Sequence, residues 1–276
     1  MSAQDLSSSP LGQRSIYIDN YDDTLLFPIS RQPNRDAIAV SHPLPFKGYD
    51  IWTAFELSWL NDKSKPVVAV ADITIPCDSP NIIESKSLKL YLNSFNNTCF
   101  TSQERVLETI RRDLGKAAGK EVGVVIYSAQ EFAEVPIGQF EGFYLDELDV
   151  LCSQYEVNAD LLHTQDEFVK NASVYSHLLK SNCPVTAQPD WGSILINYSG
   201  ARIDHASLLQ YLVSFRNHNE FHEQCVERIF MDLMTRCQPE ELTVYARYTR
   251  RGGLDINPIR SSKEITPPVN IRLYRQ

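Results

Sequence analysis

The chain has 276 residues, of which 43% are hydrophobic and 22% charged, values typical of a globular protein with a well-buried core. This length suits one large domain or two of ordinary size. The net charge of −9 argues against binding nucleic acid through its phosphates, which needs a basic surface, and favours a small-molecule partner.

The first half of the chain begins with an arm and two strands. Residues 1–48 are rich in Ser, Asp, Asn and Pro, which predicts an irregular N-terminal arm. Residues 50–60 are rich in aromatic side chains, and residues 67–75 alternate so that Val67, Ala69, Ala71, Ile73 and Ile75 share one face. Both stretches predict strands, and we expect them to form an antiparallel pair.

Two helices and a strand follow. Residues 84–95 predict a helix after a turn at residues 78–80. In the next helix, Thr101 and Glu104 have capping-box spacing and Gly115 can end the helix. Its apolar stripe consists of Val106, Leu107, Ile110 and Leu114. Residues 122–127 predict a short buried strand.

An acidic stretch separates the two halves. Residues 131–167 contain ten acidic residues and no Lys or Arg, which predicts a solvated connection. We therefore predict an N-terminal module over residues 49–150 and a C-terminal module over residues 151–276. An exposed surface of no special role has the same composition, so we infer no partner from it.

The second half repeats the order of the first. Residues 194–198 alternate as a strand, and one helix begins near Asp204. Residues 220–237 predict another helix, residues 242–248 a strand, and residues 270–274 a strand that closes the sheet. The repeated order predicts an α+β protein with antiparallel sheets backed by helix pairs.

One segment of the second half carries a thiol and a carboxylate seven residues apart, Cys183 and Asp190. Pro184 and Pro189 exclude this segment from a helix, so the two groups can meet only across a turned loop. A thiol near an acid suits covalent catalysis, in which sulfur attacks an electrophilic carbon and the acid moves protons. A buried cysteine and a turn-forming aspartate would give the same pattern without catalysis.

Two further stretches suit an anionic ligand. Ser85 and Lys86 lie at a predicted helix start, where free N–H groups and the helix dipole favour a phosphate, although simple capping is the alternative. Arg251 and Gly252 lie in an Arg-Arg-Gly-Gly run after a predicted strand, which is either a nucleotide-phosphate site or an exposed basic loop. No GxGxxG follows a predicted strand, so a dinucleotide would not bind in a Rossmann domain.

His218, His222 and Glu223 lie around another predicted helix start. The two histidines are four residues apart, but no third ligand follows at a recognisable spacing, so we predict no metal site. Glu223 could instead accept two N–H donors from a purine-like ring.

The cysteines and the N-terminus indicate where the protein works. The six cysteines form no CxxC pair and no Cys/His cluster at zinc spacing. Residues 1–10 lack the basic end and apolar core of a signal peptide, and no apolar run approaches the ~20 residues that span a membrane. We therefore expect a cytoplasmic protein with reduced thiols and no membrane or nucleic-acid partner.

Four separated motifs together resemble one family. Residues 84–91 read ESKSLKLY and fit the signature E-[SL]-K-[SA]-h-K-[LY]-[YFW], where h is apolar, of the NADPH-dependent 7-cyano-7-deazaguanine reductases. Residues 183–190, the pair His222-Glu223, and residues 250–258 also resemble the long, two-module form of these nitrile reductases of queuosine biosynthesis. The resemblance covers nearly the whole chain from about Asp50 onward, with no departure at a motif position.

The resemblance implies a fold and a reaction. The family has the tunnelling fold (T-fold), here in two tandem modules, and it assembles into closed barrels, so a homodimer or larger assembly is implied. Cys183 matches the cysteine that attacks the nitrile carbon to give a covalent thioimide, and Asp190 matches the proton donor. Two hydrides from two NADPH molecules then convert the thioimide to an amine.

The resemblance also assigns binding residues. Those matching the substrate contacts are Ile83, Glu84, Ser85, His222 and Glu223. Those matching the NADPH contacts are Ser85, Lys86, Arg251 and Gly252.

Two other classes of protein remain as alternatives. A pterin or cyclohydrolase-type enzyme of the same fold would need zinc and a Cys/His ligand set. A non-catalytic deazapurine-binding protein would need neither Cys183 nor an NADPH motif.

Overall fold

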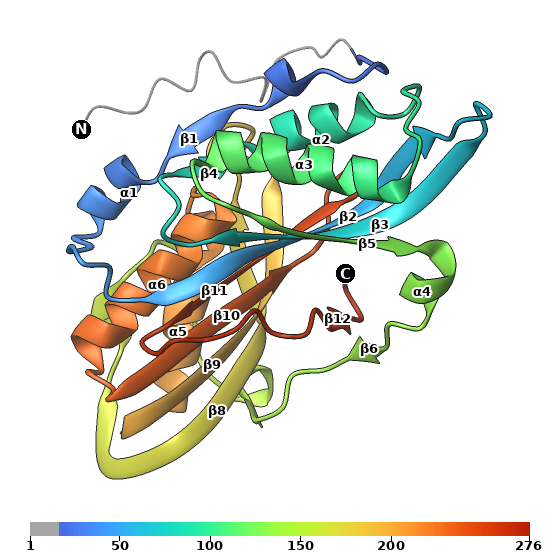
Figure 1. Ribbon diagram of the computed structural model, residues 1–276. Helices are drawn as coiled ribbons and strands as arrows, with labels where there is room; N and C mark the ends of the chain where they lie inside the picture. Colours follow the sequence, from blue (N-terminus) through green and yellow to red (C-terminus); the bar gives the residue numbers. More distant parts are fainter. Residues whose placement is uncertain (1–16) are drawn as a thin grey trace.

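The computed structural model describes residues 17–276, and one long sheet runs through it (Figure 1). Its strands are β2 (Lys47–Leu60), β3 (Pro66–Pro76), β5 (Gly123–Ser128), β7 (Phe143–Tyr144), β8 (Thr164–Asn182), β9 (Pro189–Ile203), β10 (Glu241–Tyr248) and β11 (Leu254–Ser261). They lie in the order β5-β3-β2-β11-β10-β9-β8-β7. Within this sheet, only β7 and β8 pair in parallel, so the predicted α+β class with antiparallel pairing is confirmed.

The five strands predicted within residues 50–248 lie in β2, β3, β5, β9 and β10 and are confirmed. The sequence missed β8 and β11. The first half of β8 is mostly exposed and shows no alternation, whereas every residue of β11 is buried although several are polar. A strand with polar residues at buried positions lacks the hydrophobic pattern on which sequence reasoning depends.

Four main helices accompany the sheet, and all four were predicted: α2 (Ser85–Asn93), α3 (Gln103–Ala118), α5 (His205–Ser214) and α6 (His222–Arg236). The predicted ends of α3 are wrong. Ser102, not Thr101, caps its start, and the helix continues past Gly115 to Ala118. Gly119 is its C-cap, with a φ of 75° that glycine adopts without steric cost. Within residues 17–276, no helix is both long enough and apolar enough to cross a membrane.

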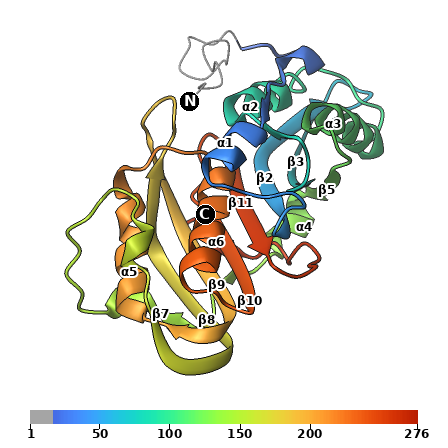
Figure 2. The same cartoon turned by 90° about the vertical axis from the view of Figure 1, so that its left-hand side faces the viewer.

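The helices cover one face of the sheet in two pairs (Figure 2). α2 and α3 pack on β2, β3 and β5 through one apolar cluster, which also includes Leu254 and Ile256 of β11. α5 and α6 pack on β8, β9 and β10 through a second cluster. The space between the two pairs therefore lies above β2 and β11.

The opposite face of the sheet carries the chain end and a short connection. A small apolar cluster joins Phe140 and Leu273 to strand residues of β2, β10 and β11. The prediction that residues 270–274 close the main sheet is wrong, because β12 (Arg272–Leu273) pairs in parallel with β6 (Ile137–Gly138) in a separate small sheet. α4 (Ala129–Ala133) precedes β6, and most of residues 131–167 are exposed, as predicted for a solvated connection.

The predicted irregular arm is partly wrong. Residues 1–16 lie outside the described part, but β1 (Pro28–Ser30) pairs with β4 (Asn81–Ile83), and α1 (Gln32–Ala37) follows β1. A strand of three residues is too short to show alternation, and it depends on a partner some fifty residues away. The remaining short helices are η2 (Asp23–Leu25), η3 (Leu145–Glu147), η4 (Ala159–Leu161) and η5 (Phe215–Asn217).

Pairing of β11 with β2 joins the two halves of the chain. The paired residues run from Leu254 opposite Ala54 to Ser261 opposite Lys47. The halves therefore share one continuous sheet, and the boundaries at residues 49–150 and 151–276 stay a prediction.

Gly48 lies in the pairing of β2 with β11, at a point where the two backbones approach closely. Its φ is +144°, and a Cβ there would lie 2.0 Å from the carbonyl oxygen of Ile259. We expect Gly48→Ala to lower the free energy of unfolding by about 2 to 4 kcal/mol, because the strands must separate or the backbone must strain. Urea denaturation followed by circular dichroism measures this change.

Gly115→Ala is the matched control for this experiment. Gly115 lies inside α3, and its Cβ would meet only the carbonyl oxygen of Lys120, at 3.5 Å. The substitution should leave stability unchanged or raise it by about 0.5 to 1 kcal/mol. A Gly48→Ala variant as stable as the parent protein would contradict the tight pairing.

Candidate active site

The start of α2 brings several predicted residues to the space between the helix pairs. Glu84 is the N-cap, and its carboxylate accepts hydrogen bonds from the backbone N–H groups of Lys86 and Ser87, both at 2.8 Å. This cap holds the first turn in place. Ser85 and Lys86 line a cavity there, and Ile83 lines a smaller one. Glu84 itself belongs to neither cavity wall, because its carboxylate turns back onto its own helix.

The tip of the β8–β9 hairpin carries the candidate nucleophile. The N–H of Cys183 donates to the carbonyl of Gln188 at 2.9 Å, and the N–H of Ala187 donates to the carbonyl of Cys183 at 3.0 Å. Ala187 has a positive φ of 54°, which lets the chain reverse here. Asp190 follows in β9, opposite Ser181. This hairpin is the turned loop that the two prolines predicted.

Asp190 is held by a cation. It is 3% exposed, and Nη1 of Arg251 donates to its Oδ1 at 2.5 Å. The same guanidinium donates to the side chain of Gln188. Nε2 of His222 lies 3.7 Å from the same Asp190 oxygen. Arg251 was predicted as an NADPH contact, and in this structure it is also the partner of the candidate proton donor.

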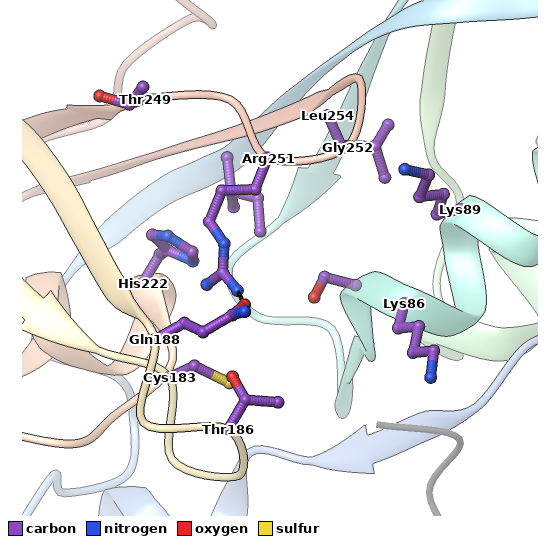
Figure 3. Close-up of a pocket in the computed structure, with 12 residues that line it drawn as sticks. Lys86, Lys89, Cys183, Thr186, Gln188, His222, Thr249, Arg251, Gly252 and Leu254 are labelled. Carbon is purple, nitrogen blue, oxygen red and sulfur yellow. Dashed lines mark hydrogen bonds between the residues drawn. The ribbon is translucent and has the colours of Figure 1, made fainter. Parts of the chain in front are cut away.

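Two cavities meet around these residues. The larger one has a volume of about 430 Å³ and the smaller one about 20 Å³. Their shared wall residues are Ser85, Cys183, His222, Arg251 and Ile256. Figure 3 shows the hairpin tip on one side of the larger cavity and α2 on the other, with Arg251 reaching in from the β10–β11 turn. Except for Glu84, all the predicted site residues line one cavity or both.

The start of α6 supplies two titratable groups. The ring of His222 packs edge-on against Tyr248, with the centroids 4.1 Å apart, and burial lowers the pKa of His222. Glu223 is 3% exposed and lines the smaller cavity. Burial, and then the negative charge of Asp50, raises the pKa of Glu223 to about 8. Without a ligand, Glu223 therefore holds its proton at neutral pH.

A buried ionic network lies behind Glu223, and sequence reasoning missed it. Glu227, one turn further along α6, accepts hydrogen bonds from Arg35 Nη2 at 2.7 Å and Arg260 Nη2 at 2.8 Å. Asp50 accepts from Arg31 Nη2 at 2.5 Å and lies 2.8 Å from Arg260. Burial alone would raise the pKa of both carboxyls, but the arginines, Arg260 foremost, lower it. The network ties α1, β2, α6 and β11 together under the site.

Other wall residues were also missed. The additional side chains are Trp52, Ile82, Lys89, Pro184, Thr186, Gln188, Phe221, Thr249, Leu254 and Ile256. Lys89 could have been found, because it lies one turn after Lys86 within the signature run. Trp52 and Ile256 carry no such signal, since only the β2–β11 pairing places them opposite each other.

One cluster in the described part of the chain has metal-ligand chemistry. The potential ligand atoms of His218, Glu220 and Cys225 lie within 4.8 Å of one another. Glu220 is already paired, because Nε of Arg228 donates to it at 3.0 Å and His218 Nε2 lies 2.8 Å away. Although burial opposes it, these two partners lower the pKa of Glu220. The cluster is a paired ionic group beside the site.

These features define a class of enzyme that uses a cysteine for covalent catalysis and binds an anionic cofactor. A thiol and a carboxylic acid share one cavity wall, which suits covalent attack on an electrophilic carbon with proton transfer. Cationic side chains line the adjoining larger cavity, as an anionic cofactor requires.

Comparisons with known proteins place the chain within this class. Residues 17–126 match the family described as "Nitrile reductase, 7-cyano-7-deazaguanine-reductase N-term", and residues 189–267 match the one described as "QueF-like protein". An NADPH-dependent 7-cyano-7-deazaguanine reductase of Paracidovorax citrulli is 58% identical over 97% of this chain and 98% of its own length. Its counterpart in Albidiferax ferrireducens is 57% identical over 98% of both chains.

The chain belongs to the family of NADPH-dependent 7-cyano-7-deazaguanine reductases. The resemblance read from its four motifs is therefore confirmed. An apo crystal structure of the archaeosine synthase QueF-Like aligns with 37% of this chain and 99% of its own, at 14% identity and a TM-score of 0.31. A similarity at that level carries no argument about the fold.

The raised pKa of Glu223 predicts how stability depends on pH. The folded protein retains this proton to about pH 8, whereas the unfolded chain loses it near 4.5. The folded state thus binds more protons in this window, so its carboxyl makes the free energy of unfolding fall as pH rises. Glu223→Gln has no such proton and should lose less stability than the parent between pH 6 and 9 in urea denaturation.

Glu240→Gln is the control, because Glu240 is exposed on the turn before β10. Its stability should follow the parent at every pH. If the pH profile of Glu223→Gln also followed the parent, Glu223 would not be protonated in the folded site.

Proposed function

We propose that this enzyme reduces the nitrile of 7-cyano-7-deazaguanine to the aminomethyl group of 7-aminomethyl-7-deazaguanine, in the biosynthesis of queuosine, a modified tRNA nucleoside. The observation that carries this proposal is the position of Cys183 and Asp190 on one cavity wall, beside a larger cavity lined by cations. The names of the relatives and the family support the same reaction.

The covalent step balances with these two residues. The thiol of Cys183 gives its proton to Asp190 as the sulfur attacks the nitrile carbon to form a C–S bond, and Asp190 passes that proton to the nitrile nitrogen, giving a thioimide. NADPH, when bound, supplies the hydride that this more electrophilic carbon accepts. Loss of the thiolate then leaves an imine, and a second hydride, with two protons taken up from solvent over the whole sequence, completes the four-electron reduction and restores the thiol. Arg251 positions the Asp190 carboxyl, and His222 lies 3.7 Å from it on the same cavity wall.

The substrate ring is assigned to the smaller cavity and the space next to it. A volume of about 20 Å³ admits an edge of a ring rather than a whole ring, so the remainder would lie in the larger cavity. Glu223 is proposed to release its proton as the ring binds and, as a carboxylate, to accept the N–H donors of that edge, with His222, Ile83 and Ser85 lining the ring's surroundings. Glu84, whose carboxylate lines neither cavity, is proposed as a substrate contact from its motif alone.

The cofactor is assigned to the larger cavity. Ser85 and Lys86 lie at the positive end of α2, and Arg251 and Gly252 lie in the β10–β11 turn opposite. Gly252 has a φ of +58°, a left-handed backbone conformation that glycine adopts without steric cost in this turn. Together these residues provide N–H donors and cations for the phosphates of NADPH without a Rossmann motif.

The wider architecture belongs to the same proposal. The order strand, strand, helix, helix, strand occurs in both halves, which supports two tandem T-fold modules. A homodimer is supported by β5, an edge strand of the sheet, with exposed Val68 and Val125 near that edge. All six cysteines are free, which supports a cytoplasmic location.

The test of the covalent step uses the substrate without NADPH. The intact mass of the parent protein should rise by one molecule of 7-cyano-7-deazaguanine, because the thioimide forms and cannot be reduced. Cys183→Ala should show no rise. Cys99→Ala is the control, because Cys99 is exposed and outside both cavities, and it should form the adduct normally.

A Cys183→Ala variant that still gained the substrate mass would overturn the assignment of the nucleophile. A parent protein that formed neither adduct nor amine product, with NADPH present, would overturn the proposed reaction itself.

The cofactor assignment predicts a selective defect in Lys86→Ala. Loss of one charge-assisted hydrogen bond, worth about 1.5 to 3 kcal/mol, should weaken NADPH binding roughly tenfold to a hundredfold. Adduct formation at Cys183 should be unchanged, because that step uses no NADPH. Titration of NADPH and intact mass spectrometry measure the two effects separately.

Lys65→Ala, an exposed charge change in the β2–β3 turn, is the control and should leave both measurements unchanged. Arg251→Ala is less selective, because it also removes the partner of Asp190. Parent-like NADPH affinity in Lys86→Ala would assign the cofactor to other residues.

A further inference from the structure

Trp52 lies at the floor of the smaller cavity. Trp52 lies in β2 opposite Ile256 of β11. Both side chains line this cavity together with Cys183 and Glu223. The indole is 1% exposed and packs into the apolar cluster beneath α2 and α3. Strands on both sides hold it, so its orientation is fixed before any ligand binds.

The indole N–H has no hydrogen-bond partner among the described residues, although it is fully buried. Buried tryptophan N–H groups usually have a partner, because leaving a donor unsatisfied costs about 1 to 3 kcal/mol. Trp59, seven residues further along β2, is also buried but lines neither cavity. Its N–H is not among the fully buried donors that lack a partner. An unsatisfied donor at a cavity wall indicates an acceptor that arrives with a ligand.

We propose that the N–H of Trp52 donates a hydrogen bond to an acceptor on the substrate ring, beside the edge that Glu223 holds. This inference rests on the proposed function. A guanine-type ring carries its two N–H donors next to each other, with a carbonyl oxygen beside one and an unprotonated ring nitrogen beside the other. A carboxylate that takes the donors therefore needs a neighbouring donor for an acceptor, and Trp52 supplies it.

The other side chains of the smaller cavity are less suited to this contact. The guanidinium of Arg251 already donates to Asp190 and Gln188, and the hydroxyl of Ser85 lies 3.4 Å from Glu84. A rigid donor at this point also gives specificity. A ring with an amino group in place of the acceptor would place two donors against each other and leave both unpaired.

The variant Trp52→Phe tests the inference, because it removes the N–H and keeps an aromatic ring. We expect the dissociation constant of 7-cyano-7-deazaguanine to rise roughly tenfold to a hundredfold, with NADPH affinity unchanged. Trp59→Phe, the matched change in the same strand, should bind both within twofold of the parent. Substrate affinity in Trp52→Phe within twofold of the parent would overturn the inference, while an active parent enzyme would leave the proposed function intact.

A second measurement needs no change at Trp52. The chain has three tryptophans, so its ¹⁵N–¹H spectrum has three indole signals, and Trp59→Phe and Trp191→Phe assign the third to Trp52. Saturating substrate without NADPH should shift the Trp52 proton downfield and slow its exchange with deuterium, while the Trp59 signal stays in place. A Trp52 signal unaffected in position and exchange would overturn the inference even if Trp52→Phe failed to fold.

Discussion

The antiparallel pairing of β2 with β11 is the constraint on which the rest of the structure depends. It joins strands about two hundred residues apart and makes one sheet from the two halves of the chain. The two helix pairs must then lie on the same face, with a gap above this seam. Because β11 begins in the same seam, the turn that precedes it brings Arg251 to the gap. The cavity is thus a consequence of how the halves are joined.

Charge inside the seam sets the state of the site. Three arginines face Asp50 and Glu227, and both carboxyls are kept ionised despite burial. Glu223 lies one turn from Glu227 on α6 but makes none of these pairs, so burial and the charge of Asp50 keep its proton on. A buried carboxyl without a partner costs folding free energy, which a ligand with N–H donors would restore on binding. The proposed binding role of Glu223 and the local cost of its burial therefore have the same physical origin.

The helix starts add a second level of organisation. α2 and α6 both begin at the cavity, so the positive ends of two helix dipoles and their free N–H groups face the same space. The first turn of α2 is capped by the carboxylate of Glu84. At the start of α6, the side chains of His222 and Glu223 line the smaller cavity instead. The hairpin tip then closes the space with Cys183, and Arg251 bridges the tip to the turn before β11. Four elements distant in sequence thus contribute to one site.

The sequence by itself determined the α+β class, the four main helices, five of the strands, the turned loop around Cys183 and the family, because local periodicity and contiguous motifs carry that information. Only the tertiary structure decided which strands pair and which side chains face each other. β11 carries polar residues at buried positions, where the strand pairs with β2 and its Arg260 donates to Glu227 of α6. β1 forms as a strand because it pairs with β4. Trp52 reads as an ordinary core residue of a strand, and Arg251 as a phosphate-binding cation, until their neighbours are known. Burial, pairing and charge compensation are properties of contacts between distant segments, and no local pattern encodes them.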